Sequence, residues 1–373
     1  MRTELCDRFG IEYPIFVFTP SEKVAAAVSR AGGLGVLGCV RFNDAEDLEN
    51  VLCWMDENTD GKPYGVDVVM PAKVPTEGSA VDIDKLIPQT HRDFVDKTLA
   101  DLGVPPLSDD GDRNEGVLGW LHSVARSHVD VALKHPIKLI ANALGSPPKD
   151  VIDQVHAAGV PVAALAGSAK HALRHVENGV DIVVAQGHEA GGHTGEIGSM
   201  VLWPEIVDAL DGKAPVLAAG GIGTGRQVAA ALALGAQGVW MGSAFLTAAE
   251  YDLGVRLESG RSVVQEAMLK ATSADTVRRR IYTGKPARLL KSRWTDAWDA
   301  EGAPEPLPMP LQNILVSGAH QRMSESSDPS TVAMPVGQIV GRMNEIRPVA
   351  DIVAELVEGF ESASQRLNTI REG

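Results

Sequence analysis

The chain has 373 residues, of which 44% are hydrophobic and 22% are charged, so it carries enough apolar sequence for one large core. Its formal net charge of −15 disfavours nucleic acid and anionic membranes as partners, because both repel an acidic surface. The three cysteines, Cys6, Cys39 and Cys53, form no CxxC pair and do not suggest a disulfide framework. No apolar signal core follows Met1 and no run is long enough to span a membrane, so we expect a cytoplasmic protein.

Short apolar segments alternate with amphipathic segments along the first 250 residues. We expect eight strands, at residues 15–18, 35–37, 64–69, 137–141, 160–165, 180–185, 215–218 and 237–241. Each segment is apolar on both faces, which is typical of the buried strands of a parallel sheet. Eight successive β/α units favour closure into a (β/α)₈ TIM barrel, and a doubly wound open sheet is the alternative.

Capping residues predict where several of the connecting helices begin. Thr19 opens a capping box in which Pro20 would take the first helical position. Ser168 is expected to cap a helix after the fifth strand, and Thr224 a capping-box helix after the seventh. Pro204 is expected to start a helix that ends near residue 212.

Two segments depart from the β/α rhythm. Residues 71–135 contain several helical stretches between the third and fourth strands, which predicts a helical insertion there. Residues 251–373 predict a helical C-terminal extension packed on the barrel, with helices near 263–270, 336–343 and 349–364. We therefore expect a ligand-binding barrel over residues 1–250, carrying the insertion, and an extension over 251–373.

A stretch rich in glycine follows the sixth strand and runs from Ala185 to Gly195 as AQGHEAGGHTG. Barrels of this class place active sites at the carboxyl ends of their strands, and glycines let the backbone approach a flat ligand. His193 is well placed there to exchange a proton with a bound molecule, although a solvated turn is the alternative. No metal is expected, because His188 and His193 are five residues apart rather than four, across glycines that disfavour a helix.

Two further stretches follow the seventh and eighth strands and read AAGGIGTG, from residue 218, and MGSAF, from residue 241. Amides at a glycine loop or a helix N-terminus bind anions, and barrels often hold phosphate with their last two loops. We expect such a site at Gly220, Gly221, Gly242 and Ser243. A dinucleotide fingerprint is incomplete, because Arg226 stands where its third glycine would be.

These three stretches together resemble the nitronate monooxygenase family. The likeness also includes YPI from residue 13, AGGLG from residue 31 and GQIVG from residue 337, and it covers most of the chain outside the insertion. It implies a TIM-barrel enzyme with one non-covalent FMN and His193 as the residue that handles a proton. By this resemblance the cofactor contacts would fall on Asp67, Gln186, Gly191, Gly192, Gly220, Gly221, Gly242 and Ser243.

Two departures from the family pattern lie near the expected site. The usual Gln-Ala-Pro-Met segment after the first strand is replaced by FVFTP from residue 16, and Asp67 stands where the family has asparagine. An anion beside a flavin would disfavour the reduced anionic form, unless Asp67 is protonated or turned away. Both departures affect the expected identity of the substrate more than the expected identity of the cofactor.

The resemblance implies that FMN and O₂ oxidise alkyl nitronates to a carbonyl compound and nitrite. An alternative is an NAD(P)H-dependent flavin reductase of a quinone or an enoyl-CoA thioester, with RRR from residue 278 as a local basic patch, although a solvated helix is the simpler interpretation of those arginines. A non-catalytic flavin-binding scaffold is the third alternative. The expected partners are a small-molecule substrate with O₂ or NAD(P)H, without nucleic acid or membrane; a homo-oligomer is left open.

Overall fold

The computed structural model describes residues 1–70, 86–106 and 122–372. Eight parallel strands form a closed barrel in the order β1, β2, β3, β4, β5, β6, β8 and β9. Their bounds are β1 Ile15–Thr19, β2 Leu34–Gly38, β3 Tyr64–Val68, β4 Ile140–Asn142, β5 Val162–Ala166, β6 Ile182–Gln186, β8 Val216–Ala219 and β9 Gly238–Met241. The first and last strands pair with each other, so the predicted TIM barrel is confirmed over the open sheet.

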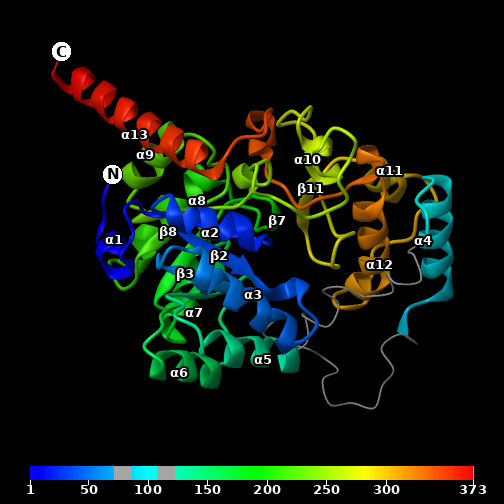
Figure 1. Cartoon of the computed structure of the whole chain (residues 1–373), viewed down its shortest axis with the longest axis horizontal. Helices are drawn as coiled ribbons and strands as arrows, with labels where there is room; N and C mark the ends of the chain where they lie inside the picture. The colour runs from blue at the N-terminus through cyan, green and yellow to red at the C-terminus, as the bar shows by residue number, and fades with distance from the viewer. Residues whose placement is uncertain (71–85, 107–121, 373) are drawn as a thin grey trace.

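Helices surround the barrel, as the ribbon view makes plain (Figure 1). They are α2 Glu22–Arg30, α3 Ala45–Asn58, α5 His122–Ala132, α6 Lys149–Ala157, α7 Ala169–Glu177, α8 Ser199–Leu210 and α9 Gly225–Ala233. A short helix that was not predicted, α1 (Glu4–Phe9), contributes Leu5 and Phe9 to the cluster that fills the barrel interior with Phe16 and Leu217. The amino-terminal end of the barrel is therefore packed, which leaves the carboxyl ends of the strands for a ligand.

The predicted caps are partly right. Ser168 caps α7 by accepting a hydrogen bond from the backbone of His171, as expected. At α2 the cap is Ser21 and not Thr19, because Thr19 still belongs to β1. At α9, Thr224 occupies the N-cap position but makes no capping bond; its hydroxyl donates instead to the Gln227 side chain at 3.1 Å.

The start of α8 was predicted wrongly. The helix begins at Ser199, and Pro204 lies inside it. The Glu189 carboxylate accepts hydrogen bonds from the Ser199 N–H at 3.3 and 3.1 Å, which stabilises the first turn upstream of the proline. A side chain from the preceding loop thus sets this helix start, and sequence spacing within the helix did not reveal it.

The insertion between β3 and β4 is confirmed in its described part, while residues 71–85 and 107–121 of it lie outside the described residues. Its helix α5 packs against α3 in the outer ring of the barrel. Its other helix, α4 (Gln89–Asp101), instead lies beside α12 (Leu311–Glu325) of the C-terminal extension, away from the barrel (Figure 1). The two helices share an apolar cluster that includes Val95 and Leu99 of α4 and Leu315 and Met323 of α12.

The C-terminal extension contains the expected helices α10 (Val263–Met268) and α13 (Val349–Glu372), together with α11 (Arg293–Asp299) and α12. The expected helix at 336–343 is a short 3₁₀ helix, Gln338–Arg342. Helix α13 returns to the barrel and packs against α9 and α2. Among the described helices, none combines the length and the apolar character needed to cross a membrane.

The extension also adds a small antiparallel sheet that was not predicted. Its strands β10 (Thr276–Arg279) and β11 (Ala287–Leu290) come from the extension, and its third strand, β7 (Gly192–His193), belongs to the glycine-rich loop after β6. In the register, His193 pairs with Ala287 and Gly192 with Arg288. The extension therefore fixes the backbone of the loop that carries the candidate catalytic histidine.

Candidate active site

A cavity of about 290 Å³ lies at the carboxyl ends of the barrel strands. All the residues that the sequence singled out line it: Asp67, Gln186, Gly191, Gly192, His193, Gly220, Gly221, Gly242 and Ser243. They come from the ends of β3, β6, β8 and β9 and from the loops that follow, which parallel pairing brings to one edge. The topology of the barrel is what collects residues that are far apart in the chain.

His193 is held on both sides by the extension. Its backbone pairs with β11, and its Nε2 lies 2.6 Å from the Thr283 hydroxyl oxygen. Desolvation lowers the pKa of His193 to about 4, and the positive charge of Lys285 adds to this effect. The imidazole is therefore neutral at neutral pH, and an anion bound in the cavity would raise its pKa by favouring the charged form.

Asp67 lies near the end of β3, opposite Gly38 of β2 and Ala141 of β4. The residue is 2% exposed, lines the cavity and has no hydrogen-bond partner for its carboxyl group among the described residues. Burial raises the pKa of Asp67 to about 8, so the carboxyl group is protonated at neutral pH. The negative charge that would oppose a reduced flavin is thus absent, and the group can donate a hydrogen bond as an asparagine amide does.

Backbone donors gather at the end of the cavity formed by the loops after β8 and β9. Gly220 and Gly221 have φ values of +99° and +69°, a region that L side chains rarely adopt. Within the described chain, the backbone N–H groups of Gly221, Ile222 and Ser243 donate to no protein acceptor. The Ser243 hydroxyl accepts from the Gly337 N–H at 2.9 Å, which leaves its own proton free to donate. Such a set of donors fits a phosphate monoester, the group that FMN carries.

The extension also forms part of the cavity wall through a close backbone crossing. A Cβ atom on Gly191 would lie 2.7 Å from the Gly337 nitrogen, and one on Gly337 would lie 2.8 Å from the Glu189 carbonyl oxygen. The Gln338 N–H donates to the same Glu189 oxygen at 3.0 Å. Both glycines are therefore required by packing of backbone against backbone, which explains why a motif near the end of the chain accompanies the glycine-rich loop.

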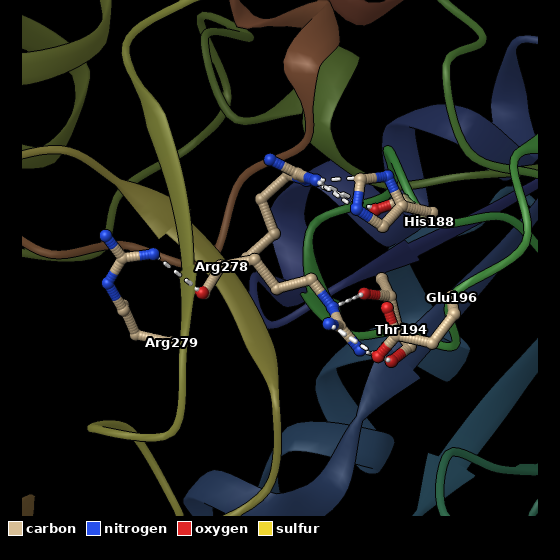
Figure 2. A network of polar contacts seen from close by, with 6 residues as sticks. His188, Thr194, Glu196, Arg278 and Arg279 are labelled. Atoms are coloured by element: carbon tan, nitrogen blue, oxygen red, sulfur yellow. Dashed lines mark hydrogen bonds and ion pairs between the residues drawn. The ribbon is translucent and has the colours of Figure 1, made fainter.

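Arg278 and Arg279 lie on strand β10 and Arg280 directly follows it, so the expectation of a solvated helix was wrong. Arg278 donates to the hydroxyl and the carbonyl oxygen of Thr194 at 2.9 and 2.8 Å and pairs with Glu196 at 2.8 Å (Figure 2). Arg279 points away along the strand and pairs with Asp299 at 2.7 Å. Side chains alternate along a strand, and for that reason neighbouring arginines have separate partners.

A further arginine, on β11, holds the other end of the same loop. Arg288 is buried, and its guanidinium donates to the His188 carbonyl oxygen at 3.2 and 3.1 Å and to the Thr276 hydroxyl at 3.0 Å. The His188 ring lies 3.3 to 3.4 Å from the same guanidinium and is not part of the cavity wall. The two histidines of the glycine-rich loop thus have different surroundings: His188 contacts Arg288, and His193 lines the cavity.

Several residues of the cavity wall were not predicted from the sequence. They include Trp240, Tyr282 and Met334, whereas Phe18 belongs to the FVFTP segment and Gly337 to the GQIVG motif, both of which the sequence had singled out. Trp240 lies on β9 and joins the cluster inside the barrel, so its strand position carried a usable signal. Tyr282 and Met334 come from the extension, and only the tertiary fold brings them to the barrel mouth.

The fold and the cavity define a β/α-barrel enzyme with its ligand site at the carboxyl ends of the strands. A family model described as nitronate monooxygenase matches residues 2–359. The chain therefore belongs to the nitronate monooxygenase family, and it is an oxidoreductase of a flavin-dependent class.

Relatives resemble the chain over nearly its whole length. A Mycobacterium tuberculosis protein provisionally named a monooxygenase is 47% identical over 373 residues, which cover 96% of each chain. The nitroalkane oxidase from Streptomyces ansochromogenes has a TM-score of 0.78 and 27% identity, over 97% of this chain and 99% of that one. FabK from Thermotoga maritima has a TM-score of 0.75 and 28% identity, over 99% of both chains. The insertion and the extension are thus included in the likeness.

Proposed function

We propose that the chain binds FMN in the described cavity and oxidises alkyl nitronates with O₂ to a carbonyl compound and nitrite. The observation that carries this proposal is the position of His193, whose imidazole lines the same cavity as a cluster of free backbone donors. The family and the nitroalkane oxidase neighbour support this chemistry. The free cysteines suit a reducing compartment, and we propose the cytoplasm as the place of action.

In this proposal one end of the cavity would bind the phosphate of FMN and the other end would bind its flavin ring. The N–H groups of Gly221 and Ser243 and the Ser243 hydroxyl would hold the phosphate of FMN. Gly191 and Gly192 would allow the flavin ring to approach the backbone, and Asp67 would donate a hydrogen bond to it from its protonated carboxyl group. Bound FMN would supply the one-electron oxidation of the nitronate.

His193 would serve the substrate. A neutral imidazole accepts a proton at one nitrogen, and Thr283 fixes the orientation of the ring through Nε2. With a neutral nitroalkane, His193 would remove the α proton and then, as an imidazolium, pair with the nitronate that it has formed. With a nitronate as the added substrate, the anion would favour the protonated ring and the pair would form directly.

The test is anaerobic mixing of the FMN-loaded protein with an alkyl nitronate, NADH or NADPH, while the flavin absorbance is followed. We expect the nitronate to bleach the flavin, nitrite to appear once O₂ is admitted, and neither nicotinamide to react. Bleaching by a nicotinamide but not by the nitronate would contradict the proposal. The outcome distinguishes an enzyme whose flavin is reduced by nitronates from one whose flavin is reduced by NADH or NADPH.

A pair of variants tests the role of His193. His193→Asn should lower kcat/KM for a neutral nitroalkane about 10²- to 10⁴-fold, the usual contribution of a general base, and should retain FMN. His188→Asn is the matched control, because His188 lies in the same loop but outside the cavity wall. A His193→Asn enzyme that keeps FMN and full turnover would refute the assignment.

A second candidate, an NAD(P)H-dependent reductase of a quinone or an enoyl-CoA thioester, is favoured by a second compartment of about 270 Å³. The compartment shares Tyr282 and Met334 with the main cavity, and it is also lined by Arg41 and His320. The rings of Tyr282 and His320 are stacked at 4.8 Å where the two spaces meet. A long substrate could occupy both compartments, and flavin bleaching by NADPH followed by reoxidation with a quinone would favour this alternative.

A further inference from the structure

A cluster of metal-binding side chains lies on the outer ring of helices, outside the described cavity. Glu49 and Cys53 are one turn apart on α3, so they share a face of that helix, and His135 follows α5, which packs against α3. One ligand atom from each residue lies within 4.8 Å of the others. None of the three residues lines the cavity, so the cluster is separate from the proposed active site.

His135 is oriented in the way that a metal ligand is. Its side chain is 5% exposed, and its Nδ1 lies 2.7 Å from an Asp56 carboxylate oxygen, which also lies on α3. Its Nε2 is buried without a hydrogen-bond partner, and the Glu49 carboxylate is 3.5 Å away. Histidines that bind metals commonly donate their second ring nitrogen to a carboxylate, which leaves the other nitrogen free to coordinate.

We propose that Glu49, Cys53 and His135 form a site for a divalent metal of the zinc type, with Asp56 as the carboxylate that orients the histidine. A thiolate, an imidazole and a carboxylate are the ligands that Zn²⁺ prefers, and three of them with one water complete a tetrahedral shell. Bond lengths of about 2.0–2.3 Å place neighbouring ligand atoms about 3.3–3.7 Å apart. The 3.5 Å between His135 Nε2 and Glu49 already lies in this range, so the exposed Cys53 thiol is the ligand that would move to close the shell.

The charged groups of the cluster favour the binding of a cation. Glu49 and Asp56 are acidic, Cys53 becomes a thiolate on binding, and Lys134, 3.9 Å from Glu49, is an exposed cation that can turn away. Zn²⁺ performs no redox chemistry, so the site would act as a clamp. It would tie α3 to the segment that leads from α5 into β4, at the point where the insertion rejoins the barrel.

The first experiment uses the FMN-loaded, untagged full-length protein under reducing conditions. Co²⁺ serves as the spectroscopic probe, and the absorbance difference is taken against the same protein without Co²⁺. We expect one equivalent to bind with a thiolate-to-cobalt charge-transfer band, and Zn²⁺ to displace it. Cys53→Ser should abolish the band, while the buried Cys6 and Cys39 remain in place as internal controls.

Two further readouts keep the test independent of folding and of activity. Asp56→Asn should weaken Zn²⁺ binding about 10- to 100-fold, as the loss of an outer-shell partner does. Zn²⁺ should also protect Cys53 from alkylation, as measured by mass spectrometry on the intact protein. Equal Zn²⁺ binding by the wild type and Cys53→Ser, or no cobalt–thiolate band, would overturn the proposal and leave His135 as a histidine held only by its contacts with Asp56 and Glu49.

Discussion

The protonation of Asp67 can be tested through the pH dependence of stability. An ordinary aspartate has a pKa of 3.8, whereas burial in the cavity wall raises the pKa of Asp67 to about 8. Between these two values the unfolded chain releases the proton and the folded chain keeps it. The raised pKa therefore makes the folded state progressively less stable as the pH rises from 3.8 to 8.

The size of the effect follows from this window. Each pKa unit corresponds to about 1.4 kcal/mol, so the free energy of unfolding loses about 3 kcal/mol between pH 5.5 and 7.5 through this one group. Asp67→Asn has nearly the same shape and does not titrate. We therefore expect the stability of the variant relative to the wild type to increase by about 3 kcal/mol over the same pH interval.

Urea denaturation of the apoprotein at several pH values, followed by tryptophan fluorescence, measures this difference. Any constant effect of the amide cancels, because only the change with pH is compared. Asp60→Asn, at a solvent-exposed aspartate outside the cavity wall, is the control for the substitution itself. A flat difference for Asp67→Asn would refute the protonated state, and a difference that falls with pH would show that the folded protein stabilises the carboxylate.

Other predictions address packing and the histidine. Gly225→Ala should destabilise the fold by about 1–3 kcal/mol in thermal denaturation, because the new Cβ would lie 2.2 Å from the Leu356 carbonyl oxygen where α9 crosses α13. Gly318→Ala, within α12 where nothing lies within 4 Å of the added methyl group, should instead stabilise by up to about 1 kcal/mol, and equal losses in both variants would contradict the packing argument. Thr283→Val removes the hydroxyl beside His193 and should lower kcat/KM for a neutral nitroalkane roughly tenfold at unchanged FMN content; unchanged steady-state kinetics would rule out a positioning role.

The barrel was predictable because its signals are local. Every predicted strand has a counterpart in the structure, since a strand buried on both faces needs a continuous apolar run and each run ends at a turn residue. The helix starts were less predictable, as α8 demonstrates. Its first turn is stabilised by the Glu189 side chain from the preceding loop, so the proline signal at Pro204 pointed to a position inside the helix.

The residues of the candidate site likewise fall into a group that the sequence could predict and a group that it could not. Residues on the barrel loops could be found because the glycines and His193 follow strands directly, and parallel topology then places them together. Gly225 ends the AAGGIGTG stretch, but nothing in that stretch indicates the close crossing of α9 with α13 at which the structure places it. Tyr282 carries no periodic signal, because the antiparallel sheet of the extension, which brings this part of the chain to the barrel, is made from segments that are distant in sequence.

The extension therefore completes the site as well as covering it. Arg278 binds Thr194 and Arg288 binds the His188 backbone, so the glycine-rich loop is held at two points on either side of β7. The loop itself contains few side chains that could pack, and without these contacts its glycines would leave His193 without a fixed position. Freedom of the backbone to approach a flat ligand and a fixed orientation of the histidine are opposing requirements. The chain meets both by taking the flexibility from the barrel loop and the rigidity from strand β11, whose Ala287 pairs with His193 from 94 residues further along the chain.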